Sequence, residues 1–208
     1  MNLYITERMN EIQKKFDEIA ENVFNNYHII REKEEYELAE IEIYYKDKDI
    51  DDIFRHHTEE HLKNNSIYNH YSGFDICLGN DSEKIYCGIL VRGIRKDSEV
   101  IFGPRKVRYK GREKKLRDIE IKKLNTSIDN FKIDSKDLKN KIFKLPRVNL
   151  SNSTSFKFLN ENINSLALFL NIKARYIVLK KEDFFTLSKE APAEPREIFN
   201  ALIEFKKS

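Results

Sequence analysis

Apolar residues near the N-terminus recur every three or four positions, which is the spacing of one face of an α-helix. The residues are Ile5, Met9, Ile12, Phe16, Ile19 and Val23. This spacing predicts an amphipathic helix within residues 1–30, with Glu and Lys on its other face. The pattern stops after three heptads, which favours a helix packed on a core over a coiled coil.

The period changes to two between Glu37 and Tyr45, which predicts a β-strand. One face then carries Ala39, Ile41, Ile43 and Tyr45, and the other carries Leu38, Glu40, Glu42 and Tyr44. The first face is apolar enough to be the core side. The second face would be ordinary surface if it held only charges, but Tyr44 beside Glu42 makes it a candidate site.

Short strand-like runs dominate the rest of the chain. They lie at 74–79, 84–94, 100–102, 142–150 and 174–180, and Gly79-Asn80-Asp81 predicts a hairpin turn between the first two. Residues 47–65 read as a polar helix or loop, and 165–170 as a short buried helix or strand. This order predicts an α+β fold with an antiparallel or mixed sheet. We divide the chain into the N-terminal helix (1–30), one α+β domain (31–187) and a C-terminal helix packed on it (188–208).

Composition narrows the class of protein. The 208 residues suit one domain with a full core, and six Gly and four Pro argue against a fibrous chain. No apolar run is long enough to span a bilayer and the N-terminus does not read as a signal peptide, so we expect a cytoplasmic protein that does not bind membranes. Cys77 and Cys87 read as buried reduced thiols, with a disulfide between them as the alternative.

Charge is distributed unevenly along the chain. Residues 1–62 carry 17 acidic and 8 basic side chains, whereas residues 105–123 carry ten basic and three acidic ones. The basic segment, which includes Arg105, Lys106, Arg108 and Lys110, would attract DNA or RNA. The alternative is a solvated, charge-rich loop.

Arg92 is the only polar side chain in the run Gly88–Ile94, which otherwise reads as buried. A buried guanidinium needs an acidic partner, and Glu42 on the other central strand is the natural one. Such a pair can also be purely structural. Glu42 and Tyr44, two apart on a strand, point the same way and would place a base beside a stacking surface.

Four histidines, at positions 56, 57, 61 and 70, fall within fifteen residues. His57, Glu60 and His61 fit the H-x-x-E-H pattern of inverted zinc proteases, although no third ligand stands out. Histidines that contact a ligand, or lie on a polar helix, are the alternative. The chain has no P-loop, dinucleotide glycine fingerprint, cysteine-rich zinc spacing or serine nucleophile elbow.

The order of these motifs resembles the alkyladenine (3-methyladenine) DNA glycosylase family over residues 38–180. Glu40-Ile-Glu42-Ile-Tyr44 followed by Asp52-Ile-Phe-Arg-His56 is similar to the hallmark strand and loop of that family. Further matches, in the same order, are Tyr71-Ser-Gly73 with Cys77, Leu90-Val-Arg92-Gly93, Gly103-Pro-Arg-Lys106, Arg147-Val-Asn-Leu150 and Ala174-Arg-Tyr-Ile-Val178.

The resemblance implies a curved, mostly antiparallel sheet flanked by helices, similar to the formyltransferase C-terminal-domain-like fold. It implies that Glu42 activates water, that Arg92 positions Glu42, and that Tyr44 and His56 sandwich a flipped base, with Tyr68, Tyr71 and Leu150 also near the base. It implies repair by hydrolytic removal of alkylated or otherwise modified purines, with no metal or other cofactor. The expected partner is DNA, with RNA or a nucleotide as alternatives, and a monomer is expected.

The hairpin departs from the family pattern. The family inserts a Tyr into the duplex, and here Ser72 directly precedes Gly73, so Tyr71 fits only with a shift of one residue. Gly79 replaces an Asn that discriminates between bases, and Asp75 replaces an apolar or aromatic residue. The alternative function is therefore a nucleic-acid or nucleotide binding module of the same fold with altered or lost activity.

Overall fold

The computed structural model describes residues 3–52, 54–109, 119–124, 141–145, 147 and 172–179. Two α-helices and a 3-10 helix accompany nine strands in this part of the chain. In chain order they are α1 (Leu3–Asn26), β1 (Tyr27–Arg31), β2 (Glu34–Lys46), the 3-10 helix η1 (Glu59–Leu62), β3 (Asn64–His70), β4 (Gly73–Leu78), β5 (Tyr86–Lys96), β6 (Glu99–Phe102), α2 (Pro104–Arg108), β7 (Ile119–Lys123), β8 (Lys141–Leu145) and β9 (Arg175–Leu179).

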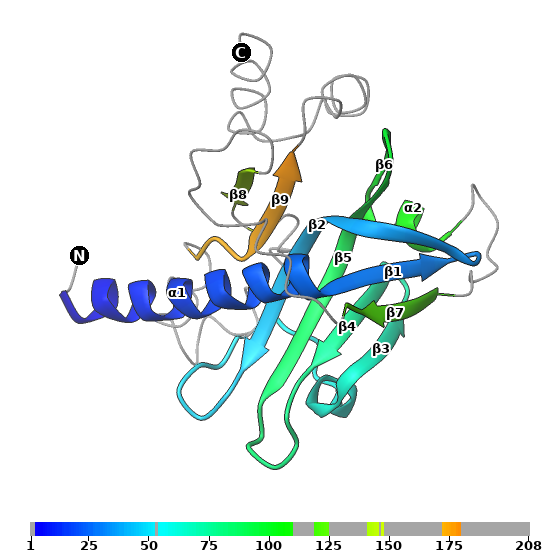
Figure 1. Cartoon of the computed structure of the whole chain (residues 1–208). Coiled ribbons are helices and arrows are strands. Elements are labelled where there is room, and N and C mark those ends of the chain that lie inside the picture. Colours follow the sequence, from blue (N-terminus) through cyan, green and yellow to red (C-terminus); the bar gives the residue numbers. More distant parts are fainter. Residues whose placement is uncertain are drawn as a thin grey trace, which may run out of the picture.

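The strands form one antiparallel sheet in the order β3-β4-β5-β2-β1-β7, and β6 continues the β5 hairpin (Figure 1). Strand β2 is the longest and organises the sheet. One edge pairs with β5 along almost its whole length, and the other edge pairs first with β1 and then, at 40–42, with β9. The edge strands β3 and β7 contact each other, so the sheet curves until it is nearly closed. The molecule is a single α+β domain with a mostly antiparallel sheet.

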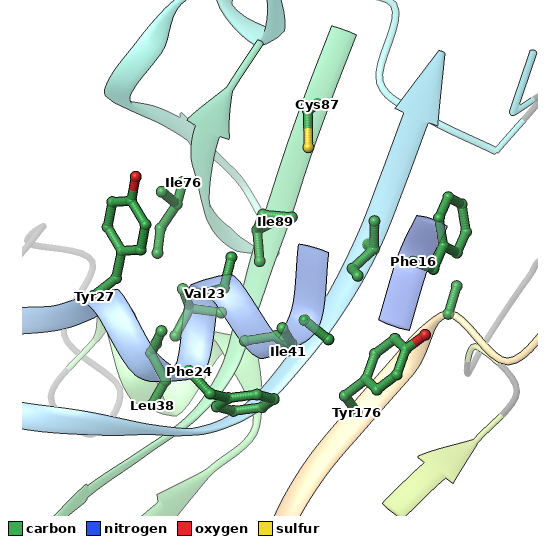
Figure 2. Packing of buried hydrophobic residues seen from close by; sticks show 14 of the residues in the cluster. Phe16, Val23, Phe24, Tyr27, Leu38, Ile41, Ile76, Cys87, Ile89 and Tyr176 are labelled. Atoms are coloured by element: carbon green, nitrogen blue, oxygen red, sulfur yellow. The ribbon is translucent and has the colours of Figure 1, made fainter. Parts of the chain in front are cut away.

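Helix α1 lies across one face of this sheet and buries its apolar stripe there (Figure 1). Phe16, Val23 and Phe24 from the helix meet isoleucines of three strands, and Tyr176 of β9 closes one end of the cluster (Figure 2). Cross-strand partners point to the same face, so the paired isoleucines Ile43, Ile89 and Ile76 form a row under α1. The neighbouring row, which includes Glu42 and Asp75, therefore faces away from the helix.

Several predicted elements are confirmed. The N-terminal amphipathic helix, the strand around Glu42 and the strands at 74–79 and 84–94 are present. The turn that joins the last two lies at 81–84, inside the Asn80–Ile85 bridge, and so begins two residues later than predicted. Cys77 and Cys87 are both buried and free, as expected for reduced thiols. The segments 165–170 and 188–208, for which we predicted buried or docking elements, lie outside the described residues.

The prediction for Leu38 was wrong. Alternation placed it with Glu40 and Glu42, but it is buried in the core with Ile41 (Figure 2). The register between β2 and β5 shifts on both sides of Glu40, so Ala39 has no partner on β5. Such a β-bulge reverses the side-chain alternation locally, and a strict period of two does not anticipate it.

Four elements were not predicted. Strand β1 follows α1 without a Gly or Pro break, and β3 is an edge strand of largely polar sequence, Asn-Asn-Ser-Ile-Tyr-Asn-His. Helix α2 and strand β7 lie in or at the start of the basic segment, for which no helix or strand was predicted. Among the described residues, no helix has the length and apolar character needed to cross a bilayer.

Candidate polar site opposite the helix

The sheet register brings Glu42 to the centre of the face opposite α1. Leu90 on β5 pairs with Glu42 on one side and with Asp75 of β4 on the other, and Arg175 of β9 pairs with Glu42 at its other edge. All four side chains therefore share one face. Glu42, Asp75 and Arg175 are fully buried, although each carries an ionisable group.

Arg92 connects two buried carboxylates of β2, those of Glu40 and Glu42. Its Nη1 lies 2.9 Å from Oε2 of Glu42 and its Nε lies 2.7 Å from Oε1 of Glu40. Arg175 also reaches Glu40, with its Nε 2.6 Å from the same oxygen. The predicted pairing of Arg92 with Glu42 is confirmed, and Glu40 is a second acidic partner that sequence analysis did not assign. A buried carboxylate with a guanidinium partner is held in a defined orientation.

Tyr44 holds the other oxygen of Glu42. Its hydroxyl donates to Oε1 of Glu42 over 2.6 Å. Burial raises the pKa of Glu42 above its ordinary 4.5, while the charge of Arg92 and the hydrogen bond from Tyr44 act in the opposite direction. Burial and the neighbouring Glu42 keep the pKa of Tyr44 well above 10, so the phenol is the donor. A carboxylate oxygen accepts more than one hydrogen bond, so both oxygens of Glu42 keep acceptor capacity beyond these contacts.

A buried ion pair between Asp52 and Arg147 lies against the Tyr44 ring. Arg147 contacts Asp52 through two nitrogens, with Nη1–Oδ2 at 2.5 Å and Nη2–Oδ1 at 3.1 Å, and both side chains are fully buried. Its guanidinium carbon lies 5.0 Å from the centre of the Tyr44 ring. Asp52 also accepts from the backbone N–H of Phe54. The pair therefore fixes both the Tyr44 ring and the start of the loop that carries His56.

Asp75 is the centre of a histidine cluster. His61 Nε2 lies 2.9 Å from Asp75 Oδ2, and His70 Nε2 lies 3.1 Å from Oδ1. Burial would raise the pKa of Asp75, but the contacts with His61 and His70 outweigh it and hold the pKa below its usual value. The cluster therefore contains an ionised carboxylate with a nitrogen on each oxygen.

Aromatic and imidazole rings connect this cluster to Glu42. The ring of His56 lies 4.7 Å from that of His70, 5.8 Å from that of Tyr68 and 6.3 Å from that of Tyr44, measured between centroids. The Tyr44 and His56 planes are tilted by 45°. A base stacked between two rings needs about 7–8 Å, which is two van der Waals gaps. In this conformation Tyr44 and His56 are too close, and too tilted, to enclose one.

The other residues predicted to bind the base do not all lie near Glu42. Tyr68 lies among these rings, whereas Tyr71 lies at the β3–β4 turn with 79% of its surface exposed. The guanidinium of Arg105 lies 4.8 Å from the Tyr71 ring centre. Leu150 lies outside the described residues.

The residues predicted to contact the nucleic-acid backbone also lie in different environments. Arg105 and Lys106 are exposed on α2. Arg108 was predicted to bind nucleic acid, but it is buried and its guanidinium donates to the carbonyl oxygens of His70 and Gly73. It joins α2 to the β3–β4 hairpin, because it lies on the helix face turned toward the sheet. Lys110 lies outside the described residues.

The H-x-x-E-H reading does not correspond to a helical zinc site. The 3-10 helix begins at Glu59, after His57, which is exposed, whereas His61 is buried on Asp75.

A different set can approach a metal ion: one potential ligand atom each from His56, His70 and Asp75 lies within 4.8 Å of the others. Sequence analysis noted Asp75 only as a departure from the family pattern and did not assign it to a site. Its signal was a single acid in the apolar run Phe-Asp-Ile-Cys-Leu, the same kind of signal that identified Arg92.

Comparison with known proteins gives little guidance. No protein-family profile matches the chain, and no solved structure matches it. The chain is similar to an uncharacterized protein of Acanthamoeba polyphaga mimivirus, with 27% identity over 202 residues that cover 79% of this chain and 86% of the viral protein.

Proposed function

We propose that this protein is an N-glycosylase that removes a modified purine from nucleic acid, with Glu42 as the residue that activates water. One observation carries the proposal. A fully buried carboxylate, positioned by Arg92 and Tyr44, faces the same side of the sheet as a set of tyrosine and histidine rings. The alkyladenine-glycosylase-like fold, which the motif order resembles, is part of this proposal.

The chemistry requires few parts. Cleavage of an N-glycosidic bond passes through an oxocarbenium-like state at C1′, which a nearby carboxylate stabilises while it directs water to that carbon. Glu42 takes the proton of the water as the C–O bond forms and the C–N bond breaks, and the purine leaves with the bonding electron pair. Arg92 and Tyr44 hold the carboxylate and do not react themselves.

The rings would hold the extruded base. Unstacking a base costs a few kcal/mol, and aromatic walls offset that cost. An alkylated purine is cationic, so ring faces attract it further. Tyr44 is held by Glu42 and Arg147, so His56 must move by about 1 Å to open the gap of about 7–8 Å that a base needs.

The exposed corner at the β3–β4 turn would meet the nucleic acid. Tyr71 and Arg105 stack there, and a Cβ at Gly73 would lie only 2.9 Å from that of Pro104, so the hairpin and the start of α2 are packed together. An exposed tyrosine can stack on a base, and Arg105 and Lys106 can contact phosphates.

A binding module without hydrolysis is the second candidate. The observation that favours it is the separation of the Tyr44 and His56 rings, which leaves no room for a sandwiched base in this conformation. The two candidates differ in whether Glu42 is needed for a chemical step.

Release of free base from alkylated duplex DNA tests the proposal. Wild type should release base in single-turnover assays, and Glu42→Gln should reduce the rate at least 100-fold, since general acid–base catalysis contributes about 10²–10⁴-fold. Glu99→Gln, at an exposed position of β6, is the matched control and should match wild type. Arg92 retains Glu40 in the variant, and equal unfolding midpoints would show an intact fold.

Two results would decide against hydrolysis by Glu42. Binding of alkylated DNA without base release by wild type would favour the binding module. Equal release by wild type and Glu42→Gln would show that Glu42 does not activate water.

A further inference from the structure

His56, His70 and Asp75 come from three segments of the chain that meet beside the Glu42 site. His70 ends β3, Asp75 lies in β4, and His56 lies in the loop between β2 and η1. One ligand atom from each lies within 4.8 Å of the others. We propose that these three residues bind a divalent transition-metal ion.

The ligand types indicate the class of ion. Two imidazoles and one carboxylate suit Zn²⁺ and other first-row transition ions, whereas Mg²⁺ and Ca²⁺ prefer oxygen ligands alone. Three protein ligands also leave coordination positions open for water. Such an ion would lie next to the His56 ring, which in turn neighbours the Tyr44 ring. It would therefore lie beside the rings that are proposed to hold a base.

The spacing of two ligands already fits. Nε2 of His70 and Oδ1 of Asp75 are 3.1 Å apart. Tetrahedral ligands at about 2.0–2.2 Å from an ion lie about 3.3–3.6 Å from each other. The remaining separations are within 4.8 Å, so the His56 ring must approach by at most about 1.5 Å to match that tetrahedral spacing. His56 belongs to a loop and its side chain is partly exposed, whereas Asp75 is buried in the sheet, so His56 is the ligand free to move.

Outer partners orient both fixed ligands, as is typical of metal sites. His61 Nε2 donates to Oδ2 of Asp75, which leaves Oδ1 facing His70. Nδ1 of His70 lies 3.1 Å from the hydroxyl oxygen of Ser72, which can accept its proton and leave Nε2 as a lone pair toward the ion. In the alternative, Nε2–H of His70 simply donates to Asp75, and Ser72 donates to Nδ1.

The sheet provides the space for His61. A Cβ at Gly88 would lie 2.5 Å from Cε1 and Nε2 of the His61 ring, and a Cβ at Gly79 would lie 1.9 Å from the His61 carbonyl oxygen. Two glycines therefore let this imidazole reach the buried oxygen of Asp75. The fold thus positions a third histidine behind the carboxylate.

Zinc titration of the full chain tests the proposal directly. After chelation and dialysis, wild type should bind one Zn²⁺ per chain in isothermal titration calorimetry. His56→Ala and His70→Ala should each weaken binding at least 10-fold, and Ser72→Ala should weaken it by a smaller factor. His57→Ala, at the exposed neighbouring histidine, should match wild type within twofold.

Any of three results would overturn the inference. They are the absence of a 1:1 complex in wild type, unchanged affinity in both His56→Ala and His70→Ala, and an equal loss in His57→Ala. Because Asp75 is buried and its variants could unfold, cobalt replaces zinc in a second measurement. Wild-type protein with Co²⁺ should show the visible absorption of a nitrogen-ligated ion, and His70→Ala should lose it.

This inference is independent of the proposed hydrolysis. Both measurements use the protein without nucleic acid. A protein that binds Zn²⁺ but releases no base would support the metal site and contradict the glycosylase, and the reverse result would do the opposite.

Discussion

The carboxylate of Glu42 is fully buried, yet each of its oxygens has a partner within 2.9 Å. Burial alone would favour the protonated acid, whereas Arg92 and Tyr44 favour the charged form. This opposition makes Glu42 a carboxylate of weakened acidity that keeps a fixed direction. A water-activating base needs both properties.

The acidity of Glu42 predicts the pH dependence of base release. Its folded-state pKa lies above 4.5, and only the ionised form can take a proton from water. The rate should therefore fall as pH drops through an apparent pKa above 4.5, measured as kcat/KM against pH. Glu99→Gln should show the same acid limb, and a limb at or below 4.5 would contradict the assignment.

The raised pKa of Glu42 also predicts how its contribution to stability depends on pH. Because the pKa of Glu42 is raised on folding, its ionised form is disfavoured in the folded chain. Its contribution to the free energy of unfolding therefore decreases as pH rises from below 4.5 through the folded-state pKa.

The ion pair between Asp52 and Arg147 predicts a large loss of stability. Both side chains are fully buried, so Asp52→Asn leaves a buried guanidinium without its charge partner. We expect the free energy of unfolding, measured by urea denaturation, to fall by about 3–5 kcal/mol. Asp51→Asn is the matched control, because this neighbour is 61% exposed in its pair with Lys46, and it should change stability by less than about 1 kcal/mol. Equal losses of stability in the two variants would contradict this prediction.

At the scale of elements, the bulge in β2 decides which side chains share the polar face. Leu38 joins the core although it lies two residues before Glu40. Glu40 and Glu42 both stay on the side where Arg92 and Arg175 can reach them. Without the register shift, strict alternation would turn Leu38 out of the core.

Contact between η1 and β5 predicts the outcome of Gly88→Ala. The added Cβ would lie 2.5 Å from the His61 ring, so His61 must move away from Asp75. We expect a loss of about 1–3 kcal/mol in the free energy of unfolding. The same substitution should be much less destabilising in a His61→Ala background, because the overlapping ring is gone. A double-mutant cycle of urea unfolding measures this, and additive effects would show that the two positions do not clash.

At the scale of the molecule, α1 covers one face of the sheet (Figure 1). The opposite face is polar and carries Glu42 and Asp75. The basic residues that cluster in the sequence are only partly together in the folded structure. Arg105 and Lys106 are exposed beside Tyr71, Arg108 is directed inward, and β7 pairs with β1 and contacts β3 where the curved sheet nearly closes.

This layout predicts salt-dependent binding of nucleic acid through α2. The logarithm of the affinity should fall linearly with that of the salt concentration, because bound phosphates release counterions. The Arg105→Ala/Lys106→Ala double variant should reduce the slope by about 2, since each phosphate contact contributes about 0.9. Lys14→Ala/Lys48→Ala, at exposed lysines on α1 and after β2, should leave the slope unchanged. Fluorescence anisotropy over a salt series measures the slope, and a salt-independent affinity would refute the prediction.

Sequence patterns alone determined α1, β2, the β4–β5 hairpin and the pairing of Arg92 with Glu42. Each of these follows from local periodicity, or from the cost of burying one unpaired charge in an apolar run. Only the tertiary structure decided the bulge at Ala39, the inward direction of Arg108, the Asp52–Arg147 pair and the meeting of His56, His70 and Asp75. These features depend on strand register and on contacts between segments far apart in the chain, and periodicity along one segment carries no information about either.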